Sequence, residues 1–252
     1  MTLPFAPTPG AVALAVLAAV IVGTSKTSVG GLGAAAVALL ANLMPAKEST
    51  AAVLLLLIVG DLVAVQTYHT DTDWRMLRRL LPAVLPGIGL GAVFLRLVPQ
   101  SAMRMTLGLI LIVMVALQLW QRRRRPTAGS DHELHLGYAV ATGIGAGFTT
   151  MAANAGGPVM AMYLLAARVD KARFIGTGAW YFLLVNLSKV PFSAALGLYQ
   201  VSTLWLTLML LPAVLAGTWL GRVLARRLSQ VTFERLTLAA STAAVVSLLL
   251  PR

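Results

Sequence analysis

Apolar segments alternate with short polar or basic stretches along the whole chain. A helix needs about 20 apolar residues to cross the roughly 30 Å hydrocarbon layer of a membrane. In the first half, two segments are short for this purpose and three are adequate: 9–24 and 28–44, then 49–69, 76–98 and 102–121. In the second half the same order returns: 135–152 and 157–167, then 174–198, 202–221 and 231–250. The pattern predicts a membrane protein made of two similar halves.

The two halves also share residues. The segment Leu81–Leu85 (LPAVL) recurs at Leu211–Leu215, and at the same offset Gly87 and Gly91 correspond to Gly217 and Gly221. Glycines that recur at four-residue spacing in apolar helices favour close helix packing over a ligand role. Each half has either five crossings, or three crossings plus a re-entrant hairpin. Both counts are odd, so each half begins and ends on opposite sides of the membrane. The second half therefore starts from the opposite side, and the two halves must be inverted. We therefore predict an all-α polytopic membrane protein with two inverted transmembrane repeats, 9–121 and 135–250, joined by a basic cytoplasmic connector, 122–134.

Composition and charge agree with this architecture. The chain is 58% apolar and 11% charged, and its net charge of +12 comes from Lys and Arg clusters between apolar runs. A soluble domain needs more surface charge, and a nucleic-acid partner is not expected because the basic residues form no stripe on a polar domain. With both termini outside, most of the basic residues fall in inward loops, as the positive-inside rule requires. Those loops would also contact anionic lipid headgroups.

Two glycine-rich breaks divide the short segments. The first, Gly23–Gly33 (GTSKTSVGGLG), contains SVGG at 28–31, which is matched by NAGG at 154–157 in the second half. Such breaks mark the substrate sites of transporters built from repeats. Half-helices that begin near Val29 and Gly157 would point amide groups and positive dipole ends into the membrane, and with Lys26 they would attract an anion.

The predicted substrate-binding residues lie in these breaks and in the facing helix: Thr24, Ser25, Lys26, Thr27, Ser28, Gly30, Gly31, Asn154, Gly156, Gly157, Thr177 and Asn186. One alternative stays open at this point. If all ten segments span the membrane, Lys26 is an ordinary cytoplasmic loop lysine.

Two further charges lie inside apolar runs, Asp61 and Lys189. Charges at membrane depth cost free energy and mark functional or pairing sites. The repeat aligns Asp61 with Asn186, so their helices should face each other. One hypothesis is an Asp61–Lys189 ion pair that only joins the halves. The other makes Asp61 the proton-coupling group, with Lys189 as its partner or as a second anion ligand.

No catalytic constellation emerges, so we expect no enzyme activity, no cofactor and no metal. The three histidines fall in or near loops, and Asp61 is the lone carboxylate near the middle of an apolar run. The cluster of His132 and His135 with Asp131 and Glu133 favours a solvated connector over a metal site. The absence of cysteine excludes disulfides and thiolate chemistry.

The chain resembles the TauE/SafE sulfite exporter family of bacterial membrane transporters. The resemblance is carried by GGLG at 30–33, Asp73-Trp74-Arg75, and GAGFTTMAANAGGP at 145–158. Two departures from the family pattern are a proline missing from 32–40 and a hydroxyl missing around 53–55, and they bear on the substrate more than on the fold. The resemblance implies a protein of the bacterial plasma (inner) membrane.

The resulting prediction is a secondary transporter of a small anion, such as sulfite, an organosulfonate or a related oxyanion. Transport would proceed by alternating access, with a proton-coupled variant left open. An anion channel of the same fold is the alternative. The expected partners are the anionic substrate and membrane lipid, and a homodimer is left open.

Overall fold

The computed structural model describes residues 3–27, 33–123, 136–167, 169 and 171–227. These residues form helices and turns: α1 (Pro9–Thr27), α2 (Gly33–Leu40), α3 (Ala46–Tyr68), the short 3-10 helix η1 (His69–Asp71), α4 (Trp74–Leu97), α5 (Gln100–Arg123), α6 (Leu136–Ala153), α7 (Gly156–Ala166), α8 (Lys171–Ala195) and α9 (Val201–Arg227). The prediction of an all-helical protein is confirmed for them. The last predicted segment, 231–250, and most of the connector lie outside the described residues.

Helix length separates two classes of element. By length and composition, α1, α4, α9 and the run from α3 through η1 can cross a membrane. In contrast, α2 has 8 residues and α7 has 11. At 1.5 Å per residue these two helices are about 12 and 17 Å long, roughly half of the hydrocarbon layer. Neither short helix crosses it alone.

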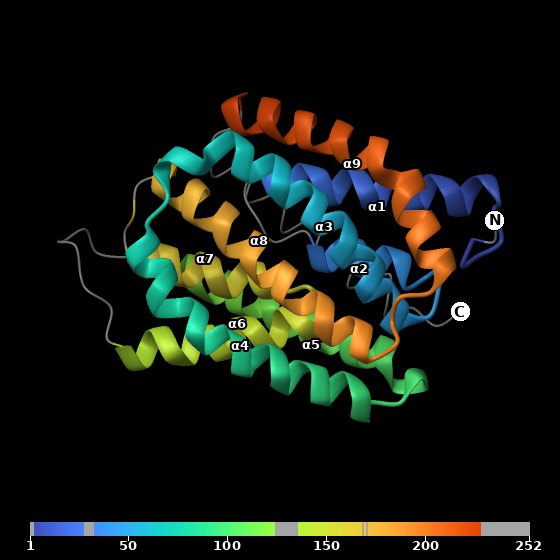
Figure 1. The fold of residues 1–252 in the computed structure, drawn as a ribbon, viewed down its shortest axis with the longest axis horizontal. Helices are drawn as coiled ribbons and strands as arrows, with labels where there is room; N and C mark the ends of the chain where they lie inside the picture. The colour runs from blue at the N-terminus through green and yellow to red at the C-terminus, as the bar shows by residue number, and fades with distance from the viewer. Residues whose placement is uncertain (1–2, 28–32, 124–135, 168, 170, 228–252) are drawn as a thin grey trace.

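The helices form a central pair flanked by two outer pairs. Helices α3 and α8 pack on each other, while α1 packs on α9 and α4 packs on α6 (Figure 1). In addition, α9 contacts α3, and α4 contacts α8. Each outer pair therefore combines one helix from each half of the chain, and both pairs lie against the central α3–α8 pair.

Glycine allows the backbones of both outer pairs to touch. A Cβ atom at Gly23 of α1 would lie 2.7 Å from the backbone nitrogen of Thr218, and one at Gly217 would lie 3.0 Å from the carbonyl carbon of Val20. In the other pair, a Cβ at Gly87 would lie 2.9 Å from the carbonyl carbon of Ile144. The predicted close packing at Gly87 and Gly217 is confirmed, because no larger residue fits either crossing without moving a backbone.

The structure corrects the prediction that a break begins at Gly23. Helix α1 continues to Thr27. The predicted start of a half-helix near Val29 lies outside the described residues. The Thr24 and Ser25 hydroxyls donate to carbonyls of their own helix, Val20 O and Val22 O, each at 2.8 Å. These side chains therefore occupy helical positions, because hydroxyls can bond the carbonyl three or four residues back without ending the helix.

Candidate functional site

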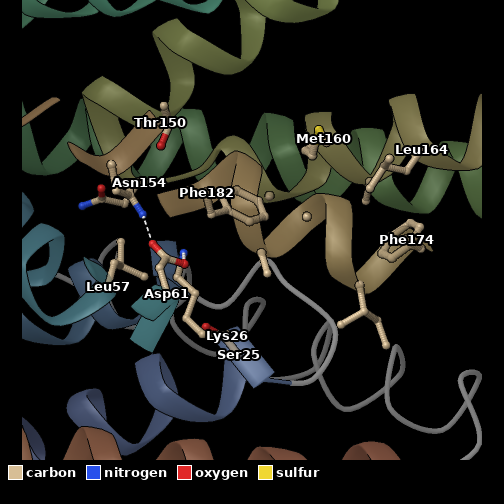
Figure 2. Close-up of a pocket in the computed structure, with 16 residues that line it drawn as sticks. Ser25, Lys26, Leu57, Asp61, Thr150, Asn154, Met160, Leu164, Phe174 and Phe182 are labelled. Atoms are coloured by element: carbon tan, nitrogen blue, oxygen red, sulfur yellow. Dashed lines mark hydrogen bonds and ion pairs between the residues drawn. The ribbon is translucent and has the colours of Figure 1, made fainter. Parts of the chain in front are cut away.

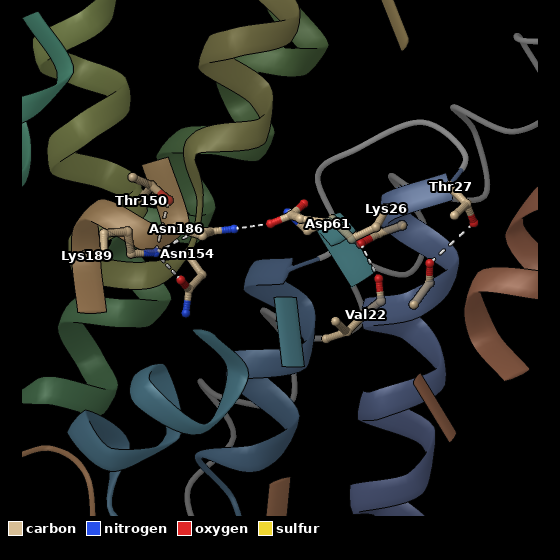
Figure 3. A network of polar contacts seen from close by, with 10 residues as sticks. Val22, Lys26, Thr27, Asp61, Thr150, Asn154, Asn186 and Lys189 are labelled. Atoms are coloured by element: carbon tan, nitrogen blue, oxygen red, sulfur yellow. Dashed lines mark hydrogen bonds and ion pairs between the residues drawn. The ribbon is translucent and has the colours of Figure 1, made fainter. Parts of the chain in front are cut away.

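A buried ion pair joins the end of α1 to the middle of α3. Lys26 Nζ lies 2.7 Å from Asp61 Oδ1, and the side chains are 8% and 1% exposed (Figure 3). Lys26 belongs to the last turn of α1, where the helix dipole favours a cation. Its ammonium also lies 4.4 Å from the ring centroid of Phe182, a cation–π contact. The alternative that Lys26 is an exposed loop lysine is therefore wrong.

Asp61 is linked to the second buried lysine through an asparagine. Asn186 Nδ2 donates to Asp61 Oδ2 at 2.7 Å, and Asn186 Oδ1 accepts from Lys189 Nζ at 3.3 Å. The hypothesis of a direct Asp61–Lys189 ion pair is wrong, because the described contacts of Asp61 are to Lys26 and Asn186. The face of α8 opposite Asp61 presents Asn186, the residue that the repeat aligns with it.

Lys189 is surrounded by neutral oxygens. Its Nζ donates to Thr150 Oγ1 at 3.2 Å and to the amide oxygens of Asn154 and Asn186. The residue is 1% exposed. The amide nitrogen of Asn154 donates in turn to the Thr50 carbonyl of α3 at 2.9 Å. Lys189 thus holds α6 and α8 together while Asn154 ties both to α3.

Asn154 occupies the turn between α6 and α7. Its φ of 52° is in the left-handed region, which asparagine tolerates better than most residues. The turn is closed by hydrogen bonds from Asn154 N to Thr150 O and from Ala155 N to Thr149 O. Helix α7 then begins at Gly156, with Pro158 in its first turn, a position that suits proline. The second break is therefore located where the sequence predicts it.

These residues surround one end of a cavity of about 60 Å³ between α1, α3, α7 and α8 (Figure 2). The polar end contains the following side chains: Ser25, Lys26, Asp61, Thr150, Asn154 and Asn186. The larger apolar side chains that line the cavity are Leu57, Met160, Leu164, Phe174 and Phe182. A water needs about 10–15 Å³ on this measure, so the cavity has room for a small ion.

A comparison with protein-family models gives one match, the model described as Sulfite exporter TauE/SafE, over residues 15–248. The chain belongs to the TauE/SafE sulfite exporter family. No curated protein and no solved structure matches it. Family membership and the apolar helices together make this a membrane protein of an anion exporter family, and the resemblance seen in the sequence is confirmed.

Part of the predicted binding set of this TauE/SafE protein lines the cavity: Ser25, Lys26, Asn154, Gly157 and Asn186. Two other members face α9, since Thr27 Oγ1 donates to Thr218 O at 2.7 Å, and the Thr24 hydroxyl, which bonds Val20 O, also lies 3.2 Å from Gly217 O. These two hydroxyls hold the α1–α9 pair together.

The remaining predicted residues lie elsewhere. Thr177 Oγ1 accepts from the backbone nitrogen of Asp73 at 2.9 Å and so anchors the start of α4 on α8. Gly156 packs against Thr150, because a Cβ atom added at the glycine would lie 2.9 Å from the Cβ of Thr150. Ser28, Gly30 and Gly31 lie outside the described residues.

Several residues that line the cavity were not predicted from the sequence, among them Phe182 and Thr150. A signal for Phe182 existed, because Phe174, Gly178, Phe182 and Asn186 recur every four residues and so share one face of α8. Thr150 has no comparable signal, since its role depends on how α6 packs against α8.

Proposed function

We propose that this protein is a secondary transporter that carries a small anion, such as sulfite, an organosulfonate or a related oxyanion, across the bacterial inner membrane by alternating access. One observation carries the proposal: a cavity lined by Asp61 and Lys26 adjoins the buried Lys189, which gives two basic groups and one acidic group. Burying an uncompensated charge costs several kcal/mol, so an anion that enters the cavity is stabilised there.

The binding groups come from three sides of the cavity. Lys26 supplies the charge, and the amides of Asn154 and Asn186 supply polar atoms at the same end. Gly157 lies in the first turn of α7, where free backbone N–H groups and the helix dipole favour an anion. The apolar end near Phe174 and Leu164 suits the organic part of a sulfonate.

The contacts between the halves support an inverted-repeat arrangement for 9–121 and 135–250. The first helix of each half, α1 or α6, packs on the fourth helix of the other half, α9 or α4. Their glycine contacts correspond as well. A Cβ atom at Gly23 would lie 2.7 Å from Thr218 N, and one at Gly147 would lie 2.9 Å from Ile88 N. We place both termini outside, because the inward loops then hold most of the Lys and Arg, in contact with anionic lipid.

Asp61 is the proposed proton-coupling group. When its carboxylate is ionised it holds the Lys26 ammonium at 2.7 Å. A proton on Asp61 would remove this attraction, so the position of Lys26 would depend on proton binding. Lys189 would act through Asn154 and Asn186, by holding their side chains in position at the cavity.

The test is anion efflux from proteoliposomes loaded with sulfite or methanesulfonate, with and without a proton gradient. Wild type should release the anion, and Lys26→Ala should lose most of the flux. Lys47→Ala, at the start of α3 and outside the cavity, is the matched control and should retain flux.

Three results would count against the proposal. The absence of efflux of either anion by wild type contradicts the function, and undiminished efflux in Lys26→Ala contradicts the site. Conductance in planar bilayers together with flux that ignores a proton gradient would identify an anion channel.

A further inference from the structure

The buried network places a donor beside each carboxylate oxygen of Asp61. Oδ1 lies 2.7 Å from Lys26 Nζ, and Oδ2 accepts from Asn186 Nδ2 at 2.7 Å. This is the arrangement of a carboxylate paired with an ammonium. The Lys26–Asp61 pair as a whole carries no net charge.

Lys189 Nζ meets three oxygens. The amide nitrogens of Asn186 and Asn154 donate to Asp61 Oδ2 and to Thr50 O, so their amide oxygens are the atoms that face Lys189. Thr150 Oγ1 is the third oxygen. Three oxygens match the three N–H donors of an ammonium.

With Lys26 and Lys189 as ammonium groups and Asp61 as a carboxylate, the network carries one positive charge in excess. Among the described residues no second carboxylate lines the cavity. One monovalent anion in the cavity would bring the sum to zero. A divalent anion would reverse its sign and leave a negative charge buried. In a medium of low dielectric constant this difference is large compared with the same difference in water.

We propose that the cavity selects anions that carry a single negative charge, and that Asp61 is the residue that sets this selectivity. The inference rests on the proposed function and adds to it the charge of the substrate. For an acid that titrates near neutral pH, such as sulfurous acid, the bound form is the hydrogen-bearing monoanion. Asp61 acts by adding a fixed negative charge at the polar end of the cavity, which repels the second charge of a dianion.

The experiment compares anions of similar size and fixed charge on purified wild-type protein at one ionic strength. Methanesulfonate and nitrate carry one charge, and sulfate and thiosulfate carry two. Thermal stabilisation and equilibrium binding should show the monoanions binding more tightly by about tenfold or more. Equal or tighter binding of the dianions would overturn the charge inference alone. If none of the four anions or sulfite binds, the proposed function fails with it.

Charge-changing variants test the role of Asp61. Asp61→Asn raises the sum to two positive charges and should move the preference toward sulfate and thiosulfate. The matched control Asp71→Asn makes the same change at an exposed position outside the cavity and should keep the monoanion preference. An unchanged preference in Asp61→Asn overturns the assignment.

A second pair of variants covers the case in which Asp61→Asn does not fold. The double variant Lys26→Gln/Asp61→Asn removes both members of the ion pair, so it avoids an unpaired partner and returns the sum to one positive charge. It should keep the preference for monoanions, with weaker binding. Lys189→Met lowers the sum to zero and should lose binding of both classes, whereas Lys47→Met should not. A preference for dianions in the double variant would contradict the proposal.

Discussion

Lys26 and Asp61 form a single buried unit, with Nζ and Oδ1 2.7 Å apart where the last turn of α1 meets the middle of α3. Both residues line the same cavity. The pair therefore links the position of α1 to the state of the binding site. Any step that separates the two groups must supply another partner for each of them.

Breaking this pair on one side should destabilise the protein. Lys26→Met leaves the Asp61 carboxylate buried without its cation, and we expect a loss of about 3–5 kcal/mol in unfolding free energy. Lys26→Met/Asp61→Leu should recover most of that loss, because two apolar groups can fill the same space. Denaturation in detergent measures both. A single variant as stable as wild type would show that the pair contributes nothing.

The glycines at the α4–α6 crossing should not tolerate a methyl group. Gly87→Ala would bring Cβ to 2.9 Å from the carbonyl carbon of Ile144, a backbone atom that cannot move independently. We expect a loss of about 1–3 kcal/mol, the usual cost of overpacking. Gly89→Ala, two residues along the same helix, meets nothing within 4 Å and should be neutral or slightly stabilising. Thermal unfolding of the two variants makes the comparison.

Asn154 has a backbone role and a side-chain role that two substitutions separate. Asn154→Ala removes the amide that contacts Lys189 and Thr50 and also leaves alanine at a φ of 52°. Asn154→Gly removes the amide but suits that φ. Both should be less stable than wild type, with Ala worse than Gly by roughly 0.5–1 kcal/mol. If Ala and Gly are equally stable, the left-handed turn does not contribute.

Gly178 offers a way to fill the cavity without disturbing the fold. It lines the cavity, and a Cβ there meets nothing within 4 Å. We expect Gly178→Leu to abolish anion efflux from proteoliposomes while the thermal midpoint stays within a few degrees of wild type. Gly145→Leu, on α6 and outside the cavity, also starts from open space and should retain efflux. Normal efflux in Gly178→Leu would place the substrate path elsewhere.

Hydropathy and the repeat predicted much of this fold for physical reasons. Long apolar runs can form little except membrane helices, and Gly156 with Pro158 marks a helix start at its first turn. The first break was predicted several residues too early. Gly23 looks like a helix breaker in the sequence, yet it lies within α1 because α9 needs a residue without a side chain at that crossing.

The binding site was only partly predictable. The alignment of Asp61 with Asn186 follows from the repeat, and the structure brings the two into contact. The Lys26–Asp61 pair depends on how α1 is rotated against α3, and no pattern within either helix contains that rotation. The roles of Thr24 and Thr27 depend likewise on their distance to α9.

The two glycine crossings also limit which helices can travel as a block. Because α1 and α9 touch through backbone atoms, they share one rigid arm, and α4 with α6 forms another. Each arm combines one helix that precedes the connector with one helix that follows it. Under the proposed alternating-access mechanism, we expect the two arms, and not the N- and C-terminal halves, to be the pieces that move past the α3–α8 core. A half expressed alone would lack the helix on which its first helix packs. Neither arm can therefore form until helices of the second half have been inserted.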